Sequence, residues 1–219
     1  MHPARPARPR GSCDRERGPL LALGASRDDG QARLSLELYI ARHGETEWSA
    51  SGRHTGKTDL PLTPAGEEKA RALRPRLAQV HFDAVFSSPL QRARRTAELA
   101  GFDQPRITPL LAEVDYGDYE GLTSVQIHEA NPSWQVYSDG CPGGESPMQI
   151  HARALEFIAL ASESGSHVLA FAHGHILRAV GAAFIRADIK VAAGLMLDVA
   201  TLSILRDDGH RMITLWNAL

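Results

Sequence analysis

From residue 34 onward, short apolar runs alternate with longer stretches in which apolar residues recur at the period of a helix. The apolar runs predict strands at residues 34–41, 84–87 and 167–172, with a short extended piece at 107–110. The periodic stretches predict helices at residues 63–80, 89–99, 146–161 and 175–184. This alternation predicts an α/β fold with a mostly parallel sheet.

Prolines and turn residues mark the expected boundaries of these elements. Thr63 and Pro64 supply an N-cap and a first-turn proline, whereas Pro75 should kink or shorten the helix that follows them. Pro89 is expected to open the next helix. The chain should end in a hairpin of residues 196–205 and 211–216.

The first 36 residues differ in composition from the rest of the chain. They hold seven arginines, four acidic residues, four prolines and four glycines, and they lack apolar periodicity. This composition predicts a disordered extension, or a start codon assigned too far upstream. The alternative is an arm that serves in targeting or binds an anionic surface. The remaining residues, 37–219, are expected to form one domain.

Composition excludes several classes of protein. The chain is 43% hydrophobic and 23% charged, and its formal net charge of −2 lacks the basic excess of nucleic-acid binders. No apolar run approaches the roughly 18 residues that span a membrane. The two cysteines, Cys13 and Cys141, have no metal-knuckle spacing. A cytoplasmic protein that contacts neither nucleic acid nor membrane is therefore expected, while the oligomeric state stays open.

Charged residues gather directly after three predicted strands. Arg42 and His43 follow the first strand, Arg92 lies shortly after the second, and His173 follows the strand at 167–172. In an open α/β sheet, ligands bind beyond the carboxyl ends of the strands. Because guanidinium groups match phosphate oxygens and imidazole titrates near neutrality, this set favours phosphoryl chemistry on a small phosphate ester.

The same residues lie in motifs that resemble a known family. The run Arg42-His43-Gly44-Glu45-Thr46, the block 87–97, the acid block that begins at Glu113 and the sequence Ala172-His173-Gly174-His175 resemble the histidine phosphatase superfamily, in its phosphoglycerate mutase-like branch. Residues 53–61 and 139–146 are most similar to small acid phosphatases and sedoheptulose-1,7-bisphosphatases. The resemblance implies a three-layer α/β/α fold.

The resemblance also implies a covalent, two-step hydrolysis without metal or other cofactor. His43 is the implied nucleophile, Glu113 the implied acid and base, and Arg42, Arg92 and His173 the implied holders of the phosphoryl oxygens. Several further residues are expected to bind substrate: His54, Thr55, Gly56, Tyr116 and Arg178. Hydrolysis of sugar phosphates or bisphosphates is the expected activity.

Alternatives stay open at several of these positions. Asp115, Asp118 and Glu120 compete with Glu113 for the role of acid, and Arg178 has a second possible placement, facing solvent. His173 and His175 form a possible metal pair, although no third ligand matches them.

Other activities are also open. In the family that this chain resembles, mutases usually carry asparagine where Ser49 stands, and the small phosphatases carry tryptophan where Val114 stands. Mutase activity and a catalytically silent phosphate-sensing module are the alternative functions. Trp134 and Tyr137 are expected either to face the substrate as part of a cap or to pack in the core.

Overall fold

The structure is a computed structural model that describes Met1 and residues 35–219. Six strands pair in the order β3-β2-β4-β1-β5-β6 in this part of the chain. The strands are β1 (Leu36–Arg42), β2 (Ala84–Ser87), β3 (Arg106–Ile107), β4 (His167–Ala172), β5 (Leu202–Asp207) and β6 (Arg211–Ala218). β1 to β4 run parallel to one another, and β5 pairs antiparallel with both β1 and β6, so the predicted mostly parallel sheet is confirmed.

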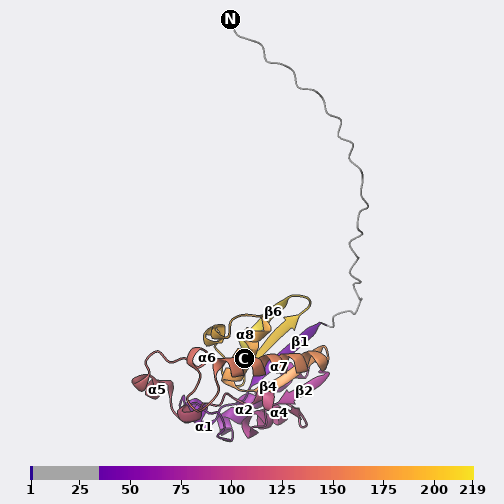
Figure 1. The fold of residues 1–219 in the computed structure, drawn as a ribbon. Coiled ribbons are helices and arrows are strands. Elements are labelled where there is room, and N and C mark those ends of the chain that lie inside the picture. The colour runs from indigo at the N-terminus through magenta and orange to yellow at the C-terminus, as the bar shows by residue number, and fades with distance from the viewer. Residues whose placement is uncertain (2–34) are drawn as a thin grey trace. The chain divides into compact units, whose positions relative to one another are not determined.

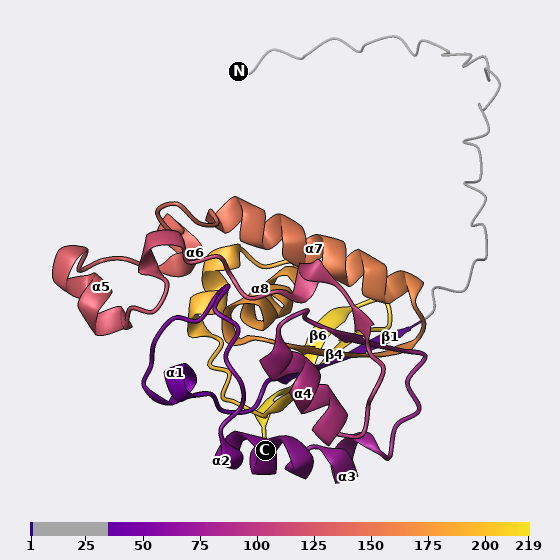
Figure 2. The same ribbon diagram turned by 90° about the horizontal axis from the view of Figure 1, so that it is seen from below.

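Helices cover both faces of this sheet (Figures 1 and 2). The described helices are α1 (Glu47–Ala50), α2 (Pro64–Ala72), α3 (Arg74–Leu77), α4 (Gln91–Leu99), α5 (Ser124–Ala130), α6 (Val136–Asp139), α7 (Pro147–Glu163) and α8 (Gly174–Phe184). Figure 2 shows α7 on one side of the sheet and α2 and α3 on the other. Three 3₁₀ turns complete this part of the chain: η1 (Pro109–Leu111), η2 (Gly117–Tyr119) and η3 (Ile189–Gly194). The expected three-layer arrangement is confirmed.

The core divides between the two faces because side chains alternate along each strand. Leu38 and Ile40 of β1 belong to the cluster that packs under α7 and α8. Tyr39 and Ala41 belong to the second cluster, with Leu73 and Leu77 near α2 and α3. The sheet is thus buried on both faces, which leaves its edges and strand ends for ligands.

Several predicted boundaries differ from the structure. The extended piece expected at 107–110 is a strand only at Arg106–Ile107, and Pro109–Leu111 form the 3₁₀ turn η1. α4 begins at Gln91 rather than at Pro89, because Leu90 is still extended and the Asp59 carboxylate accepts the Gln91 N–H at 2.8 Å. β5 begins at Leu202 rather than at residue 196, because Ala200 adopts a left-handed φ of 55° that interrupts the strand.

Pro75 acts as expected. α2 ends at Ala72 and a separate turn, α3, resumes at Arg74, because a proline nitrogen cannot donate to the turn before it.

The predicted N-terminal extension lies almost wholly outside the described residues. Within those residues, each helix is too short or too polar to cross a bilayer.

Candidate active site

The carboxyl ends of β1, β2 and β4 meet at one edge of the sheet, as predicted. Arg42 pairs with Ala172, and the His43 N–H donates to the Ala172 carbonyl at 2.9 Å. On the other side of β4, the Ser88 N–H donates to the Phe171 carbonyl at 2.9 Å. These contacts bring the segments that carry His43, Ser88 and His173 side by side.

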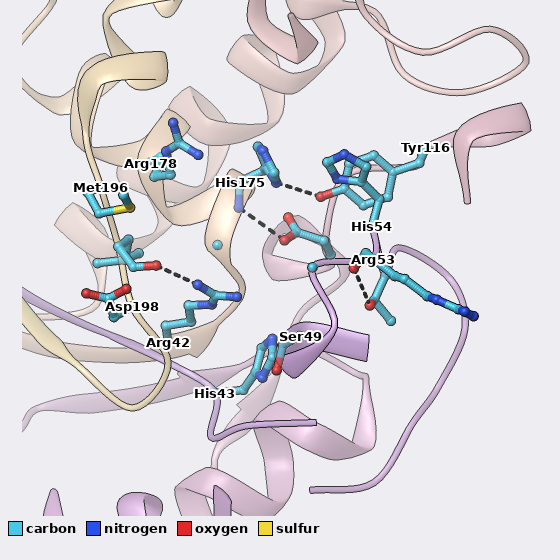
Figure 3. A pocket seen from close by; sticks show the side chains of 15 residues that line it. Arg42, His43, Ser49, Arg53, His54, Tyr116, His175, Arg178, Met196 and Asp198 are labelled. Carbon is cyan, nitrogen blue, oxygen red and sulfur yellow. Dashed lines mark hydrogen bonds between the residues drawn. The ribbon is translucent and has the colours of Figure 1, made fainter. Parts of the chain in front are cut away.

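A cavity of about 210 Å³ opens at this edge (Figure 3). Seven of the residues expected from the sequence line it: Arg42, His43, His54, Thr55, Glu113, Tyr116 and Arg178. The loop between α8 and β5 closes one side of the cavity through Met196, Leu197 and Asp198. The interruption of β5 at Ala200 therefore shapes the site.

His43 is held so that one ring nitrogen is free. Its Nδ1 lies 2.6 Å from the Gly44 carbonyl, which is an acceptor only, so Nδ1 carries the proton and Nε2 keeps its lone pair. Burial lowers the pKa of His43 well below its usual value of 6.5, and the positive charges of Arg42 and Arg92 lower it further. A buried neutral imidazole with a free Nε2 is the form that a nucleophile requires.

The turn after His43 is fixed to α4. The Gly44 N–H donates to Thr96 Oγ1 at 2.9 Å, and Thr96 Oγ1 donates to the Arg92 carbonyl at 2.7 Å. A Cβ on Gly44 would collide with the carbonyl of Gly66, so only glycine fits here. Thr96 was not singled out from the sequence, although its place one helical turn after Arg92 is a usable signal.

Arg42 presents an unsatisfied donor at the cavity wall. Its Nη1 donates to the Leu197 carbonyl at 2.5 Å. Its Nε is buried and has no hydrogen-bond partner among the described residues. A buried guanidinium N–H without a partner is costly, and an anionic ligand would relieve that cost.

Arg92 and His173 lie behind the cavity lining and are fully buried. The Arg92 Nε–H donates to His173 Nδ1 at 3.1 Å, and His173 Nε2 lies 2.7 Å from Ser88 Oγ. His173 therefore has a partner at both ring nitrogens. For His173 to contact a phosphoryl oxygen as expected, its Nε2–H must give up the hydrogen bond to Ser88 Oγ.

The other donors of Arg92 hold the loop at residues 55–58. Nη1 donates to the Thr58 carbonyl at 2.9 Å, and Nη2 donates to the carbonyls of Thr55 and Gly56 at 2.9 and 3.1 Å. Arg92 thus makes four hydrogen bonds to protein acceptors, and one of its five N–H groups has no partner among the described residues.

Gly56 differs from its expected role. Its N–H donates to the Glu120 carboxylate at 2.9 and 3.0 Å, and it is not among the residues that line the cavity. The Thr58 N–H donates to Glu120 Oε1 at 3.0 Å. A Cβ on Gly56 would lie 2.5 Å from the Val114 carbonyl oxygen, so the close approach requires glycine. Glu120 therefore fixes the loop whose carbonyls fix Arg92.

Replacing Glu120 by glutamine is expected to lower kcat by about 10-fold to 100-fold, because an amide nitrogen would face the N–H groups of Gly56 and Thr58 and displace the loop that holds Arg92. Asp118→Asn is the matched control, because this exposed side chain lies in the same segment and carries the same charge. Steady-state kinetics and melting temperatures of both variants test the prediction. Equal kcat values for the two variants would contradict it.

Glu113 lies at the N-terminus of α8. Its carboxylate accepts the N–H groups of His175 and Ile176 at 3.1 and 3.0 Å, and that of Val114 at 2.9 Å. The rival carboxylates are placed elsewhere: Asp115 pairs with Lys57 at 2.6 Å, Glu120 binds the loop, and Asp118 is exposed. Asp198, which was not singled out from the sequence, shares the cavity with Glu113.

The remaining expected residues are placed as follows. The Tyr116 hydroxyl oxygen lies 2.6 Å from His175 Nδ1, within hydrogen-bond distance, and Thr55 Oγ1 donates to the Arg53 carbonyl at 3.2 Å. Burial lowers the pKa of His54 to about 4. Trp134 and Tyr137 are buried and belong to the core, which agrees with the packing alternative.

The possible metal pair gains no third ligand. Within residues 35–219, no three His, Cys, Asp or Glu side chains lie together as a metal site would require. Arg42, Arg53 and Arg178 line the cavity and Arg92 lies behind it, so arginine side chains supply positive charge there.

Comparisons with known proteins agree with this geometry. Residues 38–219 match the sequence profile of the histidine phosphatase superfamily (branch 1). An acid phosphatase of Mycobacterium tuberculosis is 42% identical over 171 residues, which cover 76% of this chain and 84% of that protein. A sedoheptulose 1,7-bisphosphatase of Saccharomyces cerevisiae is 36% identical over 178 residues, 66% of each chain.

The fold also matches a solved structure. The structure of a functionally characterised open reading frame of Mycobacterium tuberculosis superposes with a TM-score of 0.80 at 39% identity, and it covers 84% of this chain and 97% of that one.

Proposed function

This chain belongs to branch 1 of the histidine phosphatase superfamily and is a phosphatase; we propose that it hydrolyses sugar phosphates or bisphosphates through a phosphohistidine on His43. The observation that carries the proposal is the tautomer of His43. Its Nδ1–H is bound to the Gly44 carbonyl, and its free Nε2 belongs to a side chain that lines the cavity beside Arg42.

The first step forms one bond and breaks another at phosphorus. The lone pair of His43 Nε2 attacks, the P–O bond to the alcohol breaks, and the departing oxygen takes a proton from the Glu113 carboxyl. In the second step, Glu113 takes a proton from water, whose oxygen attacks phosphorus and breaks the P–N bond. Inorganic phosphate leaves and both side chains return to their starting states.

Fixed positive charge supports both steps. Arg42 lines the cavity and Arg92 lies behind it, so two guanidinium charges act on the phosphoryl oxygens, on which negative charge concentrates. The arginines also disfavour protonation of His43. These charges supply what a metal ion supplies in other phosphoryl-transfer sites.

The substrate class is tested by phosphate release from a panel of sugar phosphates and bisphosphates. Two related proteins are an acid phosphatase and a sedoheptulose 1,7-bisphosphatase, and a cavity of about 210 Å³ suits a small metabolite. Release from at least one member is expected. Interconversion of phosphoglycerates without release would favour a mutase, and no turnover of any member would favour a silent module.

The pH profile of kcat/KM should lack a protonation step of His43 near pH 6.5. Because the pKa of His43 is held well below 6.5, the free enzyme keeps its nucleophile neutral as the pH falls through 6.5 and loses it only at lower pH. The measurement is kcat/KM between pH 4 and 8 on one substrate. If kcat/KM falls below pH 6.5 but the single-turnover rate on an activated ester does not, the titrating group is one other than His43. If kcat/KM and the single-turnover rate both fall below pH 6.5, the assignment of a neutral His43 is contradicted.

Activity should survive dialysis against a chelator, because Arg42 and Arg92 already supply the positive charge. Vanadate, which mimics the five-coordinate phosphorus, should inhibit. Loss of turnover after chelation with rescue by a divalent ion would contradict this prediction.

A further inference from the structure

Residues 139–146, which resemble a segment of small acid phosphatases, do not line the catalytic cavity. They lie where α6 ends and lead into α7, and they carry Glu145. The Glu145 carboxylate forms an ion pair with Arg153 of α7, and less than a fifth of each side chain is exposed to solvent. The cost of shielding two charges from water is offset only where their hydrogen bonds are well made, so the partners of this pair show what it holds in place.

Every donor of Arg153 is engaged. Its Nε and Nη2 donate to the two oxygens of Glu145 at 2.9 and 2.8 Å, a two-point contact that fixes the plane of the guanidinium. Nη1 donates to the carbonyls of Leu110 and Ala112 at 3.0 and 2.5 Å, and Nη2 lies 3.5 Å from the Glu113 carbonyl oxygen. These contacts use all five N–H groups, and Arg153 is not among the residues that line the cavity. Arg153 therefore holds the chain at and just before Glu113.

Glu145 holds the other side of the same segment. Its Oε2 accepts the Asp115 N–H at 2.9 Å, and its own backbone N–H donates to the Asp115 carbonyl at 2.9 Å. A Cβ on Gly144 would collide with that carbonyl, so only glycine permits this close approach of the two loops. The ion pair thus fixes Ala112 on one side of Glu113 and Asp115 on the other.

The Glu113 carboxylate is placed by short contacts that depend on this backbone. It accepts the N–H groups of His175 and Ile176, at the first turn of α8, at 3.1 and 3.0 Å. A displacement of about 1 Å in a reacting group can lower the rate by about 10²-fold. Loss of either member of the ion pair would remove fixed points that hold residues 112–115 against α8.

We propose that Glu145 and Arg153 are a positioning pair for Glu113: together they set the backbone at residues 112–115 and so aim the Glu113 carboxyl at the departing oxygen. The proposal rests on the proposed function, in which Glu113 is the acid and the base. Neither Glu145 nor Arg153 lines the cavity, so both act through Glu113.

Single-turnover release of the alcohol from an alkyl and an aryl phosphate tests the proposal, because only the alkyl ester depends strongly on a proton from the acid. Glu145→Gln keeps the size of the side chain but removes its charge and one acceptor oxygen. It should lower the alkyl rate by about 10-fold to 100-fold and the aryl rate by less than about threefold. Arg153→Lys keeps the charge but loses the two-point contact, and it should show the same selective loss.

Asp207→Asn is the matched control, because Asp207 and Arg211 form another half-buried ion pair, at 2.8 Å, in the hairpin of β5 and β6. Asp207 pairs with Leu36, at the end of β1 away from Arg42. This variant should lose stability, measured as the melting temperature, without a change in the ratio of the alkyl and aryl rates.

A double-mutant cycle with Glu113→Gln tests the route of action. In an enzyme that already lacks the acid, adding Glu145→Gln should lower the alkyl rate by less than about threefold, because residues that act through one group are not additive. Losses that add, or equal losses on both esters in Glu145→Gln alone, would overturn the proposal and leave the acid role of Glu113 intact. No loss in Glu145→Gln would overturn it as well.

Equal losses on both esters in Glu113→Gln itself would instead contradict the assignment of the acid, and the positioning role with it. A failure of the positioning pair is therefore distinguishable from a failure of the proposed function.

Discussion

Replacing His43 by asparagine is expected to lower kcat by about 10⁴-fold to 10⁶-fold, as removal of a covalent nucleophile does in other enzymes. The asparagine amide keeps much of the volume of the ring but offers no lone pair to phosphorus. Because His43 is buried and bonded to the Gly44 carbonyl, the smaller side chain is expected to lower the stability as well, and the melting temperature measures that loss separately from the loss of kcat. Steady-state phosphate release and the melting temperature are the measurements.

The matched control is His81→Asn, which changes an exposed histidine in the loop before β2. This variant should keep its turnover. A His43→Asn enzyme that retains a tenth or more of the normal kcat would show that phosphorus is attacked by another group, such as an activated water.

Glu113→Gln is expected to slow the hydrolysis of a sugar or alkyl phosphate by about 10²-fold to 10⁴-fold, because an alkoxide leaves poorly without a proton. An aryl phosphate needs less help from the acid, since its phenolate is already a stable anion. The first step of the reaction should therefore lose much less on the aryl ester. Single-turnover measurements separate this step from the hydrolysis of the phosphohistidine, in which Glu113 also takes part.

Asp198→Asn is the informative parallel variant, because Asp198 and Glu113 line the same cavity. If Asp198 donates the proton, its variant will show the larger loss on the alkyl ester. Equal losses of Glu113→Gln on alkyl and aryl esters would argue that Glu113 only positions the first turn of α8, whose N–H groups it accepts.

The parts of the fold that depend on local pattern were predictable from the sequence. The strands at 84–87 and 167–172 are observed at the predicted residues, because each is a short apolar run buried on both faces. Pro75 divides α2 from α3 for a reason that is local to proline. The meeting of Arg42, His43 and His173 follows from the parallel order of the strands, which the alternation of elements predicts.

The rest depends on contacts between distant residues. The sequence around 196–205 has the apolar character of a strand, but Ala200 takes a left-handed conformation where its N–H donates to the His43 carbonyl. Glu120 is one of several acidic residues in its segment, and only the fold shows that it lies against residues 56–58. The partners of Arg92 and His173 are likewise set by tertiary contacts. Pattern therefore predicted the residues that line the cavity better than the groups that position them.

Trapping the phosphoenzyme tests the central claim most directly. Acid-free quenching of the enzyme during turnover of a ³²P-labelled substrate, followed by peptide mapping, should place the label on the peptide that contains His43, with the alkali-stable and acid-labile behaviour of a phosphoramidate. The label should be absent from His43→Asn. Label on Ser87 or Ser88, at the carboxyl end of β2, would contradict the phosphohistidine mechanism. Catalytic turnover with no trapped label in a rapid-quench experiment on an aryl phosphate would contradict it as well.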